Sequence, residues 1–285
     1  MKKQTIYVMI AGIVIAIAAL IAFAVNASAP DSSDLSNLTV TTLKIGKADA
    51  IVIQNNDKTM LIDAGEEEDG EEVADFLEEN GVEKIDALVI THYDKDHVGG
   101  ADTIVENFEI GDVYIPDYEG TRTEYVDFLK ALDDKSITPS RLRENAEFSL
   151  GKADVLIETP LSYEIPYGFD EYDNNFSLIT TVVYGENRFV FTGDAEKQRI
   201  REWLDNSEVK ACDFLKIPHH GVYTNELDNM LRALMPDFAV ITDSKKNPAD
   251  DKTLELLQEF GVKTFEAKDG NITAVSDGKT VNVFQ

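Results

Sequence analysis

Four side chains that could bind metal lie within six positions, directly after a predicted buried strand at 85–91. They are His92, Asp94, Asp96 and His97. Carboxylates and imidazoles at a strand end lie where α/β proteins usually place a site. This ligand type suits Zn²⁺, Mn²⁺ or iron better than Ca²⁺ or a soft metal. The segment therefore predicts a metal site at a sheet edge.

The two remaining histidines follow another predicted strand end. His219 and His220 come after a strand at 214–217, and Asp194 follows a strand at 188–192. All four histidines thus lie in two strand-end loops, which favours one shared site over isolated structural roles. Asp194 could bridge two metal ions, although an Asp before a helix is also a common N-cap.

Asp63 ends a third predicted strand, at 59–63, before Ala-Gly. A carboxylate beside a ligating histidine commonly accepts its second N–H and so orients the ring. We expect Asp63 to act in this way, with a turn residue as the alternative.

The elements needed to position these residues alternate along the chain. Apolar runs and alternating patterns predict strands, and 3.6-residue periodicity predicts helices. Predicted strands cover 38–45, 50–54, 59–63, 85–91, 113–116, 153–158, 176–183, 188–192, 214–217, 238–242, 272–276 and 280–284. Predicted helices cover 73–79, 99–108, 122–133, 195–205, 224–234 and 251–260. This mixture predicts a layered α/β domain with mixed sheets, built from two similar halves that join near residue 150.

The composition limits the function. The chain has 285 residues with 54 acidic and 26 basic side chains, and its formal charge is −28. Such a field repels nucleic acid over the general surface, so we expect no stable nucleic-acid complex. An enzyme that meets phosphates at a metal site is still allowed, because bound cations invert the local field. The single cysteine, Cys212, excludes an intrachain disulfide and a cysteine-rich zinc site.

The N-terminal residues predict export. Lys2 and Lys3 precede an uncharged run from Ile6 to Val25. As a helix this run spans about 30 Å, the thickness of a hydrocarbon core. It could be a signal anchor, or a signal peptide cleaved near Ala29. We favour the anchor, since the run exceeds a usual signal-peptide core and Pro30 suits cleavage poorly. Either reading predicts an extracytoplasmic protein, membrane-anchored or secreted.

We therefore divide the chain into three parts. Residues 1–29 are the anchor or signal peptide, 30–37 a polar linker, and 38–285 the catalytic domain. An uncleaved anchor would tie the protein to the membrane. The sequence leaves the oligomeric state open.

Several motifs together resemble the metallo-β-lactamase-fold hydrolases, and within them the ComEC-type branch, the hydrolase domain attached to the competence DNA-uptake channel. The first histidine segment is the HxDxDH variant of the superfamily's HxHxDH motif. Further similar segments, in matching order, are Gly46-Lys47-Ala48-Asp49-Ala50, Leu61-Ile62-Asp63-Ala64-Gly65, Asn175-Phe176-Ser177-Leu178, Phe191-Thr192-Gly193-Asp194 and Pro218-His219-His220-Gly221.

The resemblance implies an αβ/βα four-layer sandwich with two mixed sheets and two divalent ions, Zn²⁺ or Mn²⁺, at one edge. The implied ligands are His92, Asp94, Asp96, His97, Asp194, and one or both of His219 and His220. Which of these two adjacent histidines binds metal stays open.

The sequence also departs from the family pattern. Val222 stands where Ser usually follows the second histidine motif. In the C-terminal loop, counted from Thr242, Asn247 is kept but Asp251 stands where His is usual. No histidine lies between His97 and His219, which also holds for the ComEC-type branch and disfavours a β-lactamase proper.

A two-metal centre activates water and clamps the oxygens of a displacement. Asp96 or Asp194 could orient that water and accept its proton. We expect Asn247 and Asp251 to bind substrate, and Asn175 and Ser177 either to bind substrate or to shape a turn. Lys216, Lys245 or Lys246 could offer positive charge to a phosphate.

The sequence thus predicts an exported dinuclear-metal hydrolase, a phosphodiesterase acting on nucleic acid, a nucleotide or a cell-envelope phosphodiester. The substrate would be a small molecule or a polymer. Two alternatives are a hydrolase of a non-phosphate ester or amide, and a non-catalytic surface module that binds metal or ligand. Loss of turnover on removing Asp194 separates an enzyme from a binding module.

Overall fold

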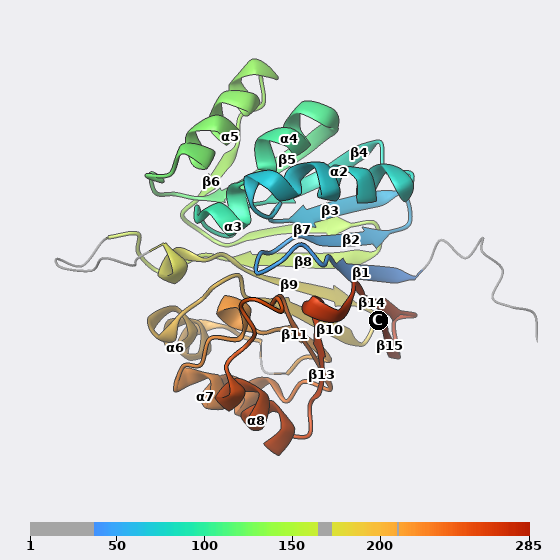
Figure 1. Cartoon of the computed structure of the whole chain (residues 1–285), viewed down its shortest axis with the longest axis vertical. Coiled ribbons are helices and arrows are strands. Elements are labelled where there is room, and N and C mark those ends of the chain that lie inside the picture. The colour runs from blue at the N-terminus through green and yellow to red at the C-terminus, as the bar shows by residue number, and fades with distance from the viewer. Residues whose placement is uncertain (1–36, 165–172, 210) are drawn as a thin grey trace, which may run out of the picture. The chain divides into compact units, whose positions relative to one another are not determined.

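Two β-sheets lie face to face at the centre of the computed structural model, which describes residues 37–164, 173–209 and 211–285 (Figure 1). The first sheet has the strand order β15-β14-β1-β2-β3-β4-β5-β6 and the second the order β13-β12-β11-β10-β9-β8-β7. The strands of the first sheet are β1 (Leu38–Thr42), β2 (Ile51–Asn55), β3 (Lys58–Ile62), β4 (Lys84–Val89), β5 (Glu109–Pro116), β6 (Ser140–Leu142), β14 (Ile272–Ser276) and β15 (Val281–Phe284). Those of the second are β7 (Ala146–Leu150), β8 (Ala153–Glu158), β9 (Ile179–Tyr184), β10 (Asn187–Phe191), β11 (Phe214–Lys216), β12 (Phe238–Ile241) and β13 (Lys263–Glu266).

Both sheets are mixed. Strands β3 to β6 run parallel, and so do β10 to β13. The remaining pairs in each sheet are antiparallel. Because parallel strands end at a common edge, the loops after β3 and β4 meet, and so do those after β10, β11 and β12. These loops carry the predicted metal ligands.

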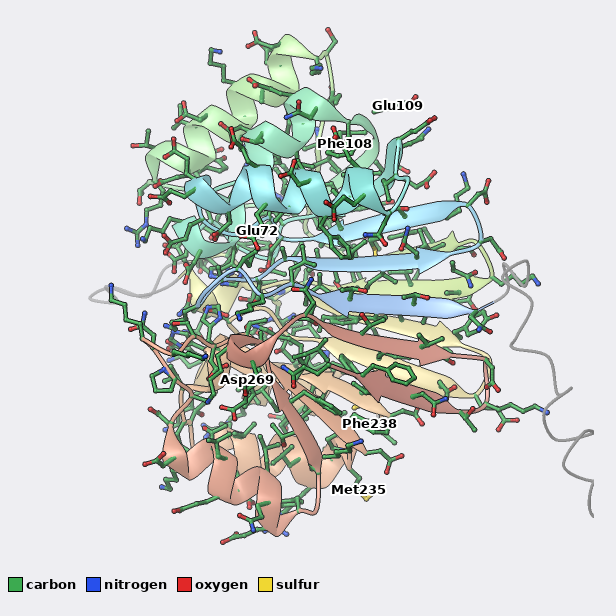
Figure 2. All side chains as sticks on the ribbon, turned by 45° about the vertical axis from the view of Figure 1, so that its right-hand side comes forward. Glu72, Phe108, Glu109, Met235, Phe238 and Asp269 are labelled. Carbon is green, nitrogen blue, oxygen red and sulfur yellow. The ribbon has the colours of Figure 1, made fainter. Side chains whose placement is uncertain are left out.

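Helices cover the outer face of each sheet (Figure 1). The first sheet is covered by α2 (Gly70–Glu79), α3 (Lys95–Val98), α4 (Ala101–Asn107) and α5 (Thr123–Asp134), and the second by α6 (Lys197–Asn206), α7 (Glu226–Leu234) and α8 (Asp251–Glu259). Short 3-10 turns complete the fold at η1 (Glu67–Asp69), η2 (Asn174–Phe176), η3 (Pro218–Gly221) and η4 (Ala267–Asp269). Glu72 on α2 and Glu109 at the start of β5 are exposed on the outside (Figure 2).

Strand alternation builds three apolar layers. Consecutive residues of a strand point to opposite faces. Met60 therefore packs between the sheets, while Leu61 packs under the helices of the first sheet. In the second sheet Phe189 lies between the sheets, and Val190 packs with the buried Trp203 of α6. The predicted four-layer αβ/βα sandwich with two mixed sheets is confirmed.

The strands expected at 272–276 and 280–284 are confirmed, and they form a hairpin. Strands β14 and β15 pair across Asp277-Gly278. The Asp277 side chain accepts hydrogen bonds from the backbone N–H groups of Lys279 and Thr280, at 2.9 and 2.8 Å. Such local hydrogen bonds are typical of Asp in a tight turn. The hairpin joins the first sheet beside β1, although the strands before it belong to the second sheet.

Three strands were missed by the sequence analysis: β6, β7 and β13. Each lies at a sheet edge and is partly exposed along its length. A short edge strand needs no continuous apolar run, so its signal is weak.

Some predicted bounds were also wrong. The helix expected at 99–108 is α4, which covers only Ala101–Asn107, and the short helix α3 (Lys95–Val98) before it was missed. The expected strand at 176–183 begins at Ile179, after the turn η2. The chain passes from the first sheet to the second between β6 and β7, close to the expected join near residue 150.

The expected localisation needs correction. The run Ile6–Val25, on which the anchor and signal peptide rested, lies outside the described residues. Within the described ranges, no helix combines the length and apolar character required to cross a membrane. We therefore do not keep the prediction of an extracytoplasmic protein, anchored or secreted.

Candidate functional site

The loop after β4 begins the site. His92 and His97 are fully buried, whereas the side chains of Asp94 and Asp96 are 24% and 21% exposed and line a cavity. The Asp94 carbonyl accepts the backbone N–H of His97 at 3.0 Å, which starts α3 directly at the site. Both imidazoles thus lie inside the protein, and both carboxylates face the opening.

Two glycines after α3 allow the loop to pack closely. A Cβ at Gly99 would lie 2.5 Å from the Glu67 nitrogen, and one at Gly100 would lie 2.4 Å from the Ala64 oxygen. Real Cβ atoms do not approach backbone so closely, so any other residue would push α3 away from the loop after β3. That loop contains Asp63.

Asp63 holds the first histidine pair, as expected from the sequence. Its carboxylate accepts hydrogen bonds from Thr91 N and Thr91 Oγ1, both at 2.7 Å, and from His97 Nδ1 at 2.8 Å. Because the Thr91 hydroxyl donates to Asp63, its oxygen accepts from His92 Nδ1 at 3.0 Å. Both imidazoles therefore donate through Nδ1, and their Nε2 atoms remain for a ligand.

The second sheet contributes Asp194 and His220. Asp194 Oδ2 lies 3.0 Å from His220 Nε2 and 3.3 Å from His97 Nε2. Asp96 Oδ2 lies 3.4 Å from His220 Nε2. The ligand atoms of these four residues all lie within 4.8 Å of one another. His92 Nε2 adds a further donor 3.7 Å from Asp94 Oδ2.

The two adjacent histidines lie in different environments. Both have positive φ, 48° for His219 and 51° for His220, so the turn η3 points them apart. His220 is buried, and its Nδ1 lies 3.0 Å from the Thr242 carbonyl. The His219 side chain is 22% exposed, with Nδ1 3.4 Å from Glu196 and Nε2 3.9 Å from Asp194. The geometry favours His220 as the metal ligand and leaves His219 on the cavity wall.

The donor atoms fit divalent metal ions. The Nε2 atoms of His92, His97 and His220 are buried and have no hydrogen-bond partner among the described residues. A buried polar atom without a partner is costly, and native structures satisfy almost all of them. Each Nε2 lies beside an aspartate, so nitrogen and oxygen donors converge as in a site for divalent metal ions. The donors cluster for a dinuclear site.

The electrostatics also favour a cation. Burial opposes a charge on His97, yet Asp194, Asp63 and Asp49 raise its pKa well above the usual range. Burial would raise the pKa of Asp194, but His220, His97 and Lys216 hold it well below its usual range. Burial, followed by the neighbouring His97, lowers the pKa of His92 to about 3. Asp194 is therefore ionised, and His92 is a neutral imidazole.

Lys216, expected to offer charge to a phosphate, does not line the cavity. It ends β11 and is fully buried. Its Nζ lies 2.5 Å from Asp49 Oδ2, 2.9 Å from the Gly193 carbonyl and 3.4 Å from Asp194 Oδ1. A lysine is rarely so buried unless it is paired, and this one is. Lys216 thus compensates charge behind the centre and cannot reach the cavity.

The other predicted substrate residues are also displaced from the cavity. The Asn175 side chain accepts the Arg199 backbone N–H at 3.1 Å, and buried Ser177 Oγ accepts that of Asp194 at 3.2 Å. These two residues shape the loops around Asp194 instead. Asn247 and Asp251 are exposed, and neither lines the cavity. The structure therefore does not bring these four residues to the cavity wall.

The C-terminal loop explains the place of Asp251. The side chain of the preceding residue, Asp250, accepts a hydrogen bond from the Tyr223 backbone N–H at 2.8 Å, in the turn after η3. Asp251 begins α8, one residue further on, and points to solvent. Lys245 and Lys246, the other expected phosphate contacts, are exposed in the same loop and do not line the cavity.

The cavity at the centre has a volume of about 290 Å³. Three cations and several polar side chains share its wall. They are Lys47, Asp94, Lys95, Asp96, Arg122, Asp173, Asn174, Asp194 and His219. The sequence analysis missed Lys47, Lys95, Arg122, Asp173 and Asn174 as wall residues. Only Lys47 and Lys95 lay within motifs that had been noted, so no local pattern marked the other three.

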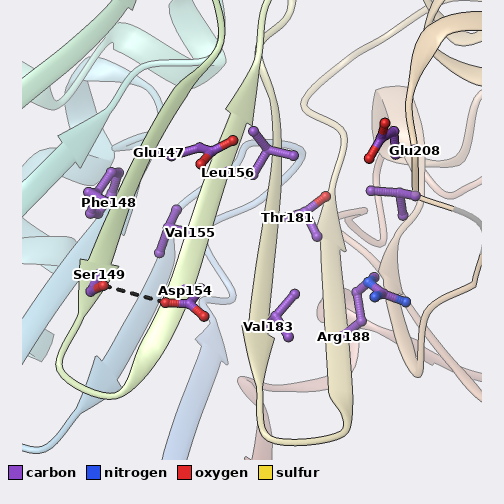
Figure 3. Close-up of a pocket in the computed structure, with 11 residues that line it drawn as sticks. Glu147, Phe148, Ser149, Asp154, Val155, Leu156, Thr181, Val183, Arg188 and Glu208 are labelled. Carbon is purple, nitrogen blue, oxygen red and sulfur yellow. Dashed lines mark hydrogen bonds between the residues drawn. The ribbon is translucent and has the colours of Figure 1, made fainter.

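A larger hollow of about 610 Å³ lies over β7 to β10 (Figure 3). Its wall includes Val155, Thr181 and Arg188, and none of the predicted site residues. The Ser149 hydroxyl and Asp154 lie within hydrogen-bonding distance in this region, at 3.4 Å (Figure 3). None of the groups of possible metal ligands found among the described residues lines this larger hollow. We therefore assign the functional site to the smaller cavity.

Comparisons with known proteins agree with this fold and site. The family model described as the metallo-beta-lactamase superfamily matches residues 44–241. ComE operon protein 3 of Bacillus subtilis is 29% identical over 66% of this chain and 24% of its own length. Recombination protein 2 of Haemophilus influenzae is 26% identical over 86% of this chain and 29% of its own length. The match therefore spans only 24% and 29% of the length of these ComEC-type relatives.

A solved structure agrees at the level of the fold. The metallo-beta-lactamase fold protein YhfI of Bacillus subtilis superposes with a TM-score of 0.57 and 14% identity. The match covers 87% of this chain and all of that one. The predicted resemblance to this fold and to the ComEC-type branch is confirmed, and so is the enzyme class of a metal-dependent hydrolase.

Proposed function

Because the chain belongs to the metallo-β-lactamase superfamily, we propose that this hydrolase cleaves a phosphodiester with two divalent ions bound at the cluster of His92, His97, Asp194 and His220. One observation carries the proposal. Three buried imidazoles donate through Nδ1 to oxygen atoms and present unpaired Nε2 atoms beside carboxylates. This arrangement is that of a preformed metal site.

The residues divide between two positions. His97, Asp96, Asp194 and His220 would hold one ion, since their ligand atoms already converge. His92 and Asp94 would hold the other, with Asp194 shared between them. Two bound divalent ions supply an activated water and a clamp for the oxygens of the displacement.

A carboxylate of the chain can accept the proton of the attacking water. Asp96 lines the cavity and is mostly buried. Burial opposes its charge, but the imidazoles of His220, whose Nε2 lies 3.4 Å away, and of His97 lower the pKa of Asp96 below its usual range. It is therefore ionised at neutral pH, and its carboxylate can orient the attacking water and accept a proton.

Positive charge on the cavity wall favours a phosphodiester over an uncharged substrate. Lys47, Lys95 and Arg122 line a cavity of about 290 Å³ in a chain of formal charge −28. Cations placed at the reacting centre stabilise the charge that develops on phosphoryl oxygens. The substrate could be a nucleotide, a nucleic acid strand or an envelope phosphodiester, since each contains a phosphate ester that this site could bind.

Turnover of bis-p-nitrophenyl phosphate tests the proposal. The purified full-length chain would be stripped with a chelator and then reloaded with Mn²⁺ or Zn²⁺, beside Asp194→Ala. The matched control is Asp205→Ala, an exposed aspartate on α6. We expect turnover that returns with metal in the wild type and the control, and is absent in Asp194→Ala. Metal binding without diester turnover would instead support an ester or amide substrate, or a binding module.

A further inference from the structure

The three cations of the cavity differ in their partners. Arg122 lies 2.9 Å from Asp94 Oδ1, and Lys95 lies 3.0 Å from Glu66 Oε1. For Lys47, the structure records no ion pair with any described residue, although this lysine lines the cavity together with Asp96 and Asp194. Its ammonium has three N–H donors and no competing carboxylate bonded to it.

The backbone holds Lys47 at the wall. It lies in the loop between β1 and β2, two residues before Asp49. The Asp49 N–H donates to the Asp96 carbonyl at 3.0 Å, and the Asp49 carbonyl accepts the Gly65 N–H at 2.9 Å. The end of this loop is thereby fixed to both strand-end loops of the first sheet that form the site. Lys47 is half-buried, in contrast to Lys44, which is exposed three residues earlier.

A phosphodiester and a neutral ester differ in negative charge, which is the property that a lysine side chain recognises. The phosphodiester carries a full negative charge shared by two non-bridging oxygens, whereas a carboxylic ester carries none. One non-bridging oxygen would face the metal-ligand cluster. The other would then need a donor on the opposite part of the wall, because an unpaired anionic oxygen in a cavity is costly.

We propose that Lys47 Nζ binds a non-bridging oxygen of the scissile phosphate, and that this contact makes the cavity selective for anionic over neutral esters. The inference rests on the proposed phosphodiesterase function and adds a specificity residue to it. Arg122 and Lys95 contribute to the local field, but each is already bonded to a carboxylate. Lys47 is therefore the wall cation that a phosphate can take without displacing another partner.

Phosphate binding by the metal-loaded full-length chain gives a test that needs no turnover. The probe is inorganic phosphate, titrated calorimetrically into wild type, Lys47→Gln, Lys47→Arg and Lys44→Gln. A charge-assisted hydrogen bond contributes roughly 1.5–3 kcal/mol. We therefore expect Lys47→Gln to weaken phosphate binding by about tenfold or more. Lys47→Arg should retain most of the affinity, and Lys44→Gln should bind as the wild type does.

Kinetics on two substrates provide the second readout. Lys47→Gln should lower kcat/KM for bis-p-nitrophenyl phosphate by about tenfold, and leave kcat/KM for uncharged p-nitrophenyl acetate within about twofold. Unchanged phosphate affinity in Lys47→Gln, no measurable phosphate binding by the wild type, or an equal loss on both substrates would overturn the proposal. If the wild type lacks metal-dependent diester turnover, the proposed function fails, while the calorimetry still decides whether Lys47 binds phosphate.

Discussion

At the residue scale, the centre depends on how buried charges are compensated. Asp49, Asp63 and Asp194 are almost fully buried, and Asp94 and Asp96 border them. Two divalent ions together with the Lys216 ammonium would balance the charge of these five carboxylates. Lys216 is the part of this compensation that the protein itself provides. Burial opposes its charge, yet Asp49 and Asp194 raise the pKa of Lys216 above its usual value.

Lys216→Met should therefore destabilise the fold. Removing one partner of a buried ion pair leaves the other charge uncompensated and costs about 3–5 kcal/mol. Denaturant unfolding of the chelated protein would measure the free energy of unfolding. Lys44→Met is the control, because Lys44 is exposed. A loss no larger than that of Lys44→Met would show that Lys216 does not compensate the buried aspartates.

The adjacent histidines give a second prediction at this scale. His220 Nε2 lies among Asp96 and Asp194, whereas His219 is partly exposed. His220→Ala should weaken metal binding by more than the roughly 10–100-fold typical of changes outside the ligand set. His219→Ala should weaken it by less than tenfold. Competition with a chromogenic chelator measures both affinities, and the reverse order would exchange the two assignments.

The residue types of the metal site could be predicted from the sequence. Which other side chains line the cavity, and which are buried behind it, could not. Histidines and aspartates at strand ends predict a metal site from their chemistry and spacing alone. Lys216 was expected to offer its charge to a phosphate because a lysine beside a motif usually lies at the surface. Its burial depends on Asp49, which comes from another sheet and is distant in sequence. Arg122 and Asn174 reach the cavity from loops without any local pattern, so only the folded chain reveals them.

At the scale of single elements, the turn before α2 carries an unusual carboxyl. Asp69 ends η1 and accepts the Glu66 backbone N–H at 2.9 Å. Burial, and then the neighbouring charges of Glu66, Glu72 and Glu68, raise its pKa to about 6. The folded state therefore binds this proton more tightly than the unfolded state does. The resulting stabilisation is complete below about pH 4 and is lost as the pH rises through about 6.

Asp69→Asn should thus stabilise the protein more at pH 8 than at pH 5. The amide keeps an oxygen acceptor for Glu66 and carries no charge to bury. Urea unfolding of both proteins at the two pH values gives the difference in the free energy of unfolding. Asp75→Asn is the control, since Asp75 is exposed on α2. If the Asp69→Asn difference does not grow with pH, the folded pKa of Asp69 is not raised.

Element prediction succeeded where burial produced a pattern. The strands β3, β4 and β10 are mostly buried, and their apolar runs predicted them. The missed strands β6 and β7 are short and lie at sheet edges, and polar residues interrupt their apolar ones. Their pairing depends on a partner strand that the local sequence does not encode. Layer order could be inferred from the family resemblance, while the return of the β14–β15 hairpin to the first sheet needed the structure.

At the scale of the whole molecule, the metal centre joins the two sheets. Asp94, Asp96 and His97 follow β4 of the first sheet, whereas Asp194 and His220 follow β10 and β11 of the second. Ions held between these loops bind the folded chain and not the unfolded one. Ligand at 100 times its dissociation constant stabilises the native state by about 2.7 kcal/mol.

Chelation should therefore lower the melting temperature of the entire folded unit by several degrees, about 2–4 °C for each kcal/mol lost. Differential scanning calorimetry before and after chelation, and after metal is restored, measures the change. In Asp194→Ala the chelator should have little effect, because the shared ligand is gone. A wild type that melts at the same temperature with and without metal would show that the centre does not link the sheets.

The metal content of the purified, reloaded protein tests the central claim most directly. Full-length wild type, Asp205→Ala and Asp194→Ala would be loaded with Mn²⁺ or Zn²⁺, freed of excess ion, and measured by inductively coupled plasma mass spectrometry. We predict two ions per chain in the wild type and in Asp205→Ala, and fewer than one in Asp194→Ala. A wild type without bound metal, or an Asp194→Ala protein that keeps both ions, would contradict the dinuclear centre.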